Sequence, residues 1–169
     1  RLKLREAEKA FEQGRLEESG RLVFEADLLK YLPGRRLADR VAERLADRVR
    51  RQALHGDFAA SWRDLDHARS IGGDSQRNLD ARQELIELVL CEVENHLRSG
   101  DATRALGLIA DLERQRVSCE TVRATRDVAR HLESARNLSL RGKFREADEQ
   151  LKAALTLRPD LDLLHRQRS

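Results

Sequence analysis

The stretch GKFREA at Gly142–Ala147 decides the fold, because three earlier stretches repeat its pattern. They are GRLEES at Gly14–Ser19, GDFAAS at Gly56–Ser61 and GDATRA at Gly100–Ala105. Each begins with glycine and a polar residue, usually continues with a hydrophobic residue and two variable residues, and ends in Ser or Ala. The four glycines are separated by 42, 44 and 42 residues. A fixed period of this length indicates copies of one supersecondary unit.

Small and apolar residues recur at fixed distances after each glycine. Five residues on are Ser19, Ser61, Ala105 and Ala147, nine on are Val23, Leu65, Ile109 and Leu151, and twelve on are Ala26, Ala68, Leu112 and Ala154. These offsets share one face of a helix that begins just after the glycine. The glycine suits the left-handed residue that ends a preceding helix, and Asp57 and Asp101 can cap the new one. The pattern therefore predicts four hairpins of two helices, each joined by a tight turn.

At these positions the chain resembles the tetratricopeptide repeat family. In that family, Gly-Asp-Tyr-x-x-Ala introduces the second helix, which closes with Ala and is followed by Pro some five residues later. The last copy matches through Gly142–Ala147, Leu151, Ala154 and Pro159. The first three copies match in part: Pro33 falls two positions late, Gly72-Gly73 ends the second copy, and Leu112 replaces the late alanine of the third. The period exceeds the family's usual length of about 34 residues, which we expect to lengthen the first helix by about two turns.

The resemblance implies an all-α, right-handed array of about four helix pairs. Its repeats would span about 1–33, 34–73, 74–117 and 118–159, within one domain over 1–169, and a further helix would open at 160–169. Arrays of this family mostly serve as non-catalytic scaffolds that bind a peptide or partner protein on a concave face lined by first helices. Groove contacts often lie six residues before each glycine, at Glu8, Arg50, Glu94 and Arg136. Arg50, Glu94 and Arg136 are therefore the candidate partner-binding residues, and the interpretation we favour over this role is that they are ordinary exposed charges.

The segment from Arg35 to Leu54 has almost no helix-breaking residue, and residues of the same kind recur in it at every fourth position. An apolar row of Leu37, Val41, Leu45 and Val49 lies beside Ala38, Ala42 and Ala46, and another row holds Arg36, Arg40, Arg44 and Arg48. The arginine row is typical of a phosphate-binding stripe, so nucleic-acid or polyanion binding is the alternative function. The first three arginines each precede an acid by three residues, which favours an exposed, self-neutralised face.

The segment from about Gln76 to Ser99 differs, because apolar residues surround most of its circumference. They are Leu85, Ile86, Leu88, Val89, Leu90, Cys91 and Val93. A helix that is apolar on most sides is usually buried on most sides. We therefore expect this helix at the centre of the array.

Composition favours a soluble helical protein with a large solvated surface. Charged residues make up 37% of the 169 residues, the mean hydropathy is −0.68, and there are two prolines. No apolar run approaches the roughly 18 residues that a membrane span needs, so we expect no membrane partner. Cys91 and Cys119 have no paired spacing and are expected to be reduced, buried or incidental thiols, which fits a cytoplasmic protein.

The net charge of +3 is slight, because 33 basic side chains are mixed along the chain with 30 acidic ones. Nucleic-acid binders usually gather basic side chains on one face and add aromatics for stacking. Phe24, Phe58 and Phe144 stand at expected helix-packing positions, and we favour core packing over base stacking for Phe58 and Phe144. For Trp62 we favour packing between repeats over a role as a binding anchor. Protein binding therefore remains the preferred function.

Catalytic and metal-binding patterns are nearly absent, so we expect neither an enzyme nor a cofactor. The five histidines never pair at zinc-binding helical spacing. Asp64 and His67 can share a helix face, but a lone pair of this kind seldom holds a metal. Asp74, Ser75 and Ser118 are expected to cap helices.

The two ends of the sequence suggest a piece of a longer protein. The chain starts at Arg1 without methionine, and Leu161, Leu163 and Leu164 resemble the start of another first helix that has no capping helix behind it. Repeat arrays normally end in a polar cap. We therefore expect flanking sequence on this protein.

Overall fold

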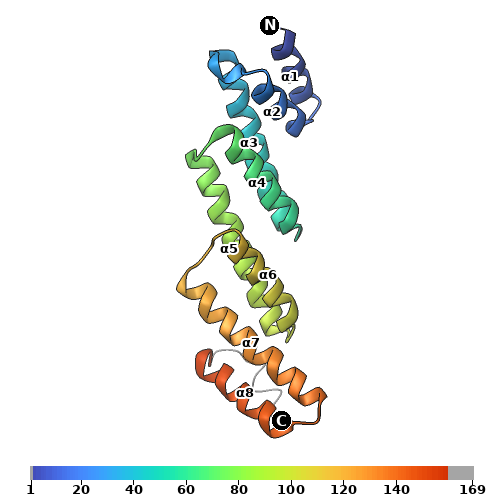
Figure 1. Cartoon of the computed structure of the whole chain (residues 1–169), viewed down its shortest axis with the longest axis vertical. Coiled ribbons are helices and arrows are strands. Elements are labelled where there is room, and N and C mark those ends of the chain that lie inside the picture. The colour runs from blue at the N-terminus through green and yellow to red at the C-terminus, as the bar shows by residue number, and fades with distance from the viewer. Residues whose placement is uncertain (1, 160–169) are drawn as a thin grey trace. The chain divides into compact units, whose positions relative to one another are not determined.

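The computed structural model describes residues 2–159, and within that range the chain is helical without strands (Figure 1). The α-helices are α1 (Leu2–Glu12), α2 (Leu16–Glu25), α3 (Leu32–Leu54), α4 (Phe58–Gly72), α5 (Gln76–Arg98), α6 (Ala102–Arg114), α7 (Glu120–Leu140) and α8 (Phe144–Leu157). A 3-10 turn, η1 (Leu28–Lys30), precedes α3. Neighbouring helices pack in pairs, which confirms the all-α class and the four hairpins. The predicted helix at 160–169 lies outside the described residues.

The four glycine turns have the same geometry. Gly14, Gly56, Gly100 and Gly142 have φ angles of +74°, +79°, +80° and +74°, a left-handed conformation that glycine adopts without steric cost. In every turn the glycine N–H donates to the carbonyl three residues back, and the next N–H donates to the carbonyl five residues back, at 2.8–3.1 Å. These two hydrogen bonds close the last turn of each first helix as a Schellman motif.

Each hairpin closes along one seam between its two helices. The residue seven before the glycine and the residue five after it are buried in all four copies: Ala7 with Ser19, Val49 with Ser61, Val93 with Ala105, and Ala135 with Ala147. In the first two copies the serine hydroxyl donates across the seam, from Ser19 to the Ala7 carbonyl at 2.8 Å and from Ser61 to the Val49 carbonyl at 3.1 Å. A small residue is needed there because the helix backbones approach within reach of one hydroxyl.

The predicted helix caps are confirmed in part. The Asp57 carboxylate accepts from the Ala60 N–H at 3.1 Å, and Asp101 accepts from the Arg104 N–H at 3.2 Å. Ser75 accepts from the Asn78 N–H at 3.3 Å. Two expectations were wrong: Asp74 pairs with Arg69 instead of capping α5, and the N-cap residue of α7 is Cys119 rather than Ser118, with no capping bond from its side chain.

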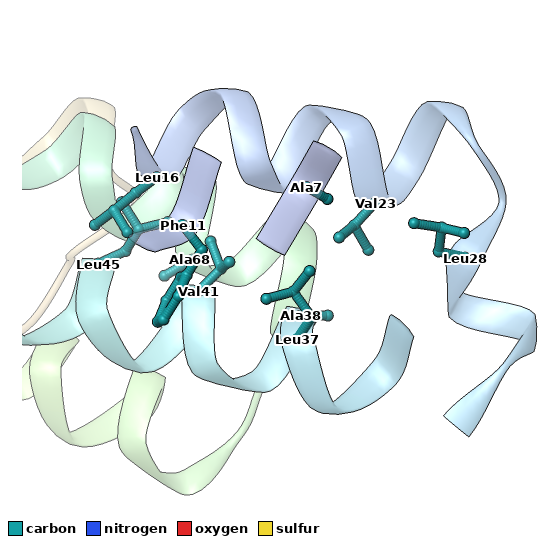
Figure 2. Close-up of a cluster of buried hydrophobic side chains, with 10 residues drawn as sticks. All are labelled: Ala7, Phe11, Leu16, Val23, Leu28, Leu37, Ala38, Val41, Leu45 and Ala68. Carbon is teal, nitrogen blue, oxygen red and sulfur yellow. The ribbon is translucent and has the colours of Figure 1, made fainter. Parts of the chain in front are cut away.

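The chain divides into two compact units, the first up to Leu85 and the second from Ile86 on, so the boundary falls within α5. The core of the first unit lies between the α1/α2 hairpin and α3 (Figure 2). Its residues are Ala7, Phe11, Leu16, Val23, Leu28, Leu37, Ala38, Val41, Leu45 and Ala68. The predicted apolar row of α3 is fully buried, which confirms its orientation.

In the second unit, α6 packs against α7 and α7 packs against α8. Its buried side chains include Val93, Leu97, Ile109, Leu112 and Val128. The expected burial of α5 on most sides is largely confirmed, since Leu85, Val89 and Val93 are buried and Leu88 and Leu90 half-buried.

Cys91 and Cys119 are free and exposed, so neither thiol belongs to a core. Within residues 2–159, no helix combines the length and apolar character needed to cross a membrane.

Two of the aromatic expectations were wrong. Phe58 and Trp62 are buried as expected, but Phe24 is 66% exposed and Phe144 is 71% exposed. Phe24 lies ten residues after its glycine, off the seam face that offsets of five and nine define. Phe144 lies two residues after its glycine, a position that is buried in the other three copies but that the described residues leave open in the last.

Candidate interaction surfaces

A hollow of about 660 Å³ opens between the second helices of the first two hairpins. Its lining from α2 is Glu17, Glu18, Gly20, Arg21, Phe24 and Glu25, and its lining from α4 is His67, Ser70 and Ile71. Both helices belong to the first unit and pack against each other. The hollow is large enough for a few side chains of a bound segment.

Gly20, Ile71 and Phe24 form the apolar part of this hollow. A Cβ atom at Gly20 would lie 2.4 Å from Ile71 Cδ1, so the missing side chain lets Ile71 rest directly on α2. Phe24 is mostly exposed, although an aromatic ring gains from burial. An apolar wall with a large exposed ring is typical of a surface that a partner covers.

Three carboxylates line the rim of the hollow, and each is paired with an arginine. Glu17 pairs with Arg48, Glu18 with Arg15, and Glu25 with Arg21, whose Nε lies 3.9 Å from a Glu25 carboxylate oxygen. Partial burial of Glu17 opposes its ionisation, but the hydrogen bond from Arg48, a backbone hydrogen bond and the charges of Arg48 and His67 together outweigh this and lower its pKa below the usual value. Glu17 is therefore charged at neutral pH.

Arg48 joins α3, α4 and α2 below this rim. Its Nε donates to Asp64 Oδ2 at 2.5 Å, one of its Nη atoms donates to Asp64 Oδ1 at 2.6 Å, and the same atom donates to Glu17. Asp64 is buried, and the bond to it raises the pKa of Arg48. Both Asp64 oxygens are thus engaged by a cation, so the Asp64–His67 pair does not present a free carboxylate to a metal. Among residues 2–159, no cluster of three His, Cys, Asp or Glu side chains suits a metal ion.

The arginine row of α3 is not a free cationic stripe. The guanidinium carbons of Arg40 and Arg44 lie 4.5 and 5.7 Å from the centre of the Phe11 ring, within cation–π range. Two of the acids that follow these arginines, Glu43 and Asp47, pair with Arg77 of α5 at 3.3 and 2.8 Å. The expected pairing along α3 was therefore wrong for these acids, whose cation comes from the next long helix.

The candidate groove residues have different surroundings. Arg50 is exposed on α3, with its Nε 3.6 Å from a Glu84 oxygen. Glu94 is half-buried on α5 and accepts from Arg158 at 2.8 and 3.3 Å and from Arg98 at 3.3 Å. Arg136 is exposed on α7, as Glu8 is on α1. Arg50 belongs to the first unit, and Glu94 and Arg136 to the second. Their shared role in one groove stays a prediction.

Sequence reasoning missed the hollow because it assigned Phe24 to the core. The available signal was the offset of Phe24, which places a large ring on the solvent side of α2 between Arg21 and Glu25. Ile71 gave no comparable signal, since its contact with Gly20 depends on how two hairpins pack.

Comparison of the chain with protein-family models, with curated proteins and with solved structures finds no match. The resemblance to the tetratricopeptide family therefore remains a prediction from the residues that carry it. The function has to be argued from the surfaces described above.

Proposed function

We propose that this chain is a non-catalytic protein-interaction scaffold, a tetratricopeptide-like array of helix hairpins that binds a segment of a partner protein. The observation that carries the proposal is the hollow between α2 and α4, with Phe24 exposed on its wall. Four hairpins with one turn geometry support the array. Stacked hairpins supply extended surfaces for recognition rather than enclosed chemistry.

The lining of the hollow specifies the bound segment. Phe24 and Ile71 offer apolar contact for one hydrophobic anchor side chain. Glu17, Glu18 and Glu25 each have an arginine partner, but a carboxylate can accept further hydrogen bonds, so they favour a Lys or Arg beside that anchor. We therefore propose a peptide with an apolar residue flanked by basic ones.

Polyanion binding has less support, because Arg40, Arg44 and Arg48 already contact Phe11 or carboxylates. Such binding would weaken steeply as salt rises, since phosphate contacts release counterions. Peptide binding at the hollow should survive moderate salt. A salt titration with a mixed-sequence oligonucleotide therefore separates the two functions.

The test is a selection of displayed peptides on the full chain, followed by affinity measurements on variants. Phe24→Ser should weaken the selected peptides by about tenfold or more, as expected when an aromatic anchor is removed. Phe144→Ser is the matched control, because it removes an equally exposed ring from the second unit. If the Phe24→Ser variant bound the peptides as tightly as the unmodified protein does, the proposed site would be contradicted. Selected peptides without basic residues would also contradict it.

A further inference from the structure

A second exposed surface of the first unit lies at the first turn of α3. Tyr31 and Leu32 stand at its start and are 65% and 61% exposed, and Arg35 and Arg36, also exposed, follow one turn later. We call these four residues the α3 patch. Leu32 and Arg36 are four residues apart and therefore share one face of the helix. The patch thus combines two large apolar side chains with two guanidinium groups.

The packing of this turn leaves the α3 patch outside the core. Gly34 and Leu37 are the buried residues here, and Gly34 lies against the backbone of Leu28 in η1. Leu37 belongs to the core cluster (Figure 2). Tyr and Arg are enriched in protein interfaces, and neighbouring exposed apolar side chains are typical of a surface that another molecule covers.

The two arginines of the patch carry charge that the carboxylates of residues 2–159 do not neutralise. Arg35 Nε donates to the carbonyl oxygen of Leu29 at 2.7 Å, so its hydrogen-bond partner is a neutral group. Arg36 has no carboxylate within ion-pair distance in the described part of the chain. The nearby Lys30 differs, because Asp27 pairs with it. The patch is therefore cationic beside its apolar residues.

The hollow between α2 and α4 has the complementary chemistry. Phe24 and Ile71 give it an apolar wall, and three glutamates line its rim. Glu25 is the glutamate held most loosely, since the Nε of Arg21 lies 3.9 Å from its carboxylate and the two side chains are 65% and 66% exposed. An exposed pair of this kind contributes little to stability. Glu25 can therefore exchange Arg21 for another guanidinium.

The hollow and the α3 patch are neighbours within the first unit. Phe24 lies on the wall of the hollow, and Tyr31 follows it by seven residues. The 3-10 turn between them, η1, packs against both α2 and α3. One molecule therefore carries both halves of a complementary contact. Two copies related by a two-fold axis can each give a patch and receive one, and dimers of this symmetry are the commonest oligomers.

We propose that the segment bound in the hollow belongs to a second copy of this chain, in a symmetric dimer. Leu32 of one copy contacts Phe24 and Ile71 of the other. Arg36 then faces Glu25 of the other copy, by charge complementarity. The dimer rests on the proposed function, because it uses the same hollow and names the partner that the hollow binds. The α3 patch also meets the requirement stated there, an apolar residue with basic ones beside it.

Sedimentation velocity of the full chain over a range of concentrations measures the dimer. A monomer–dimer equilibrium without larger species is expected, because a two-fold contact closes at two copies. Phe24→Ser and Leu32→Ser should each raise the dissociation constant about tenfold or more, since each removes an apolar anchor from both halves of the dimer. Leu54→Ser is the matched control. Leu54 is 63% exposed at the other end of α3, so its loss should leave the dissociation constant unchanged.

Charge reversal tests the pairing of Arg36 with Glu25. Arg36→Glu and Glu25→Arg should each weaken the dimer about tenfold, because each turns two attractive pairs into two repulsive ones. An equimolar mixture of the two variants should regain the affinity of the unmodified chain, since opposite charges then face each other in both halves of the mixed dimer. A mixture that associates no better than either variant alone would overturn the proposal.

The same measurements separate the dimer from the proposed function. If the chain stays monomeric while selected peptides still bind in a Phe24-dependent way, the dimer is overturned and the proposed function stands with another protein as the partner. If the chain is monomeric and no peptide depends on Phe24, both are overturned. Self-association that ignores Phe24→Ser and is abolished by Phe144→Ser would overturn the α3 patch in favour of the apolar and basic segment 140–145.

Discussion

Gly34 shows how a missing side chain sets the approach of two segments. It lies in the first turn of α3, where a Cβ atom would come within 2.1 Å of the Leu28 carbonyl oxygen and 2.6 Å of its carbon. Both are backbone atoms of η1, which cannot rotate away. Gly107 in α6 is the opposite case, since a Cβ atom there would meet nothing within 4 Å.

We expect Gly34→Ala and Gly107→Ala to change stability in opposite directions. Gly34→Ala should lower the free energy of unfolding by about 2 kcal/mol, because η1 must move away from α3. Gly107→Ala should raise it by about 0.5–1 kcal/mol, since alanine loses less backbone entropy in a helix. Urea unfolding of both variants measures this. Stabilisation by Gly34→Ala would show that η1 does not approach α3 as described.

The lowered pKa of Glu17 predicts a pH dependence. A carboxyl whose pKa is lower in the folded protein contributes stability above its unfolded pKa of about 4.5, and the contribution is lost as pH falls through the folded value. The difference in unfolding free energy between the unmodified protein and Glu17→Gln should therefore be constant near neutral pH and shrink below about pH 4.5. The same comparison in an Arg48→Gln background is the control, and there the difference should be much smaller at all pH values.

At the scale of elements, Arg48 ties three helices together. It lies on α3, bonds both oxygens of buried Asp64 on α4, and reaches Glu17 on α2. The α3–α4 hairpin therefore carries a charge pair inside its packing, which is costly when one partner is removed.

Arg48→Leu should lower the free energy of unfolding by about 3 kcal/mol, because it leaves the Asp64 carboxylate buried and unpaired. The double variant Arg48→Leu with Asp64→Leu should recover most of this loss, since no isolated charge remains. Chemical unfolding of the two single variants and the double variant measures the coupling. Additive losses would show that the pair is not the source of the effect.

The hairpins could be predicted from sequence because their determinants are local. Each turn glycine directly precedes a second helix, and the residues five and nine after it lie on that same helix. Their offsets alone therefore indicate the seam. Arg48 and Asp64 lie 16 residues apart on different helices, and no spacing rule connects them. Phe144 was misplaced for a related reason. It has the same place in its repeat as Phe58, but burial at that position depends on a later helix.

At the scale of the whole molecule, each unit has its own core. Leu45 is fully buried in the first unit, and Val128 is fully buried in the second. Stability in repeat proteins is approximately a sum of local and nearest-neighbour contributions, so a substitution can destabilise one unit without destabilising the other.

Leu45→Ala should destabilise the first unit by about 3 kcal/mol through lost burial and a cavity. Hydrogen exchange followed by mass spectrometry should then accelerate in α1 to α4, while exchange in α7 and α8 stays close to that of the unmodified protein. Val128→Ala should give the reverse pattern. Uniform acceleration across both units in either variant would show that the chain unfolds as a single cooperative body.

The uniform glycine bends also bear on how such a chain can grow. The residue after the glycine is Arg15, Asp57, Asp101 or Lys143, so it is basic at two joints and acidic at two, yet the backbone path is the same. The segment from one glycine to the next accordingly begins and ends in the same turn geometry. Gene duplication or recombination at these turns would therefore add or remove a hairpin without requiring a new type of turn.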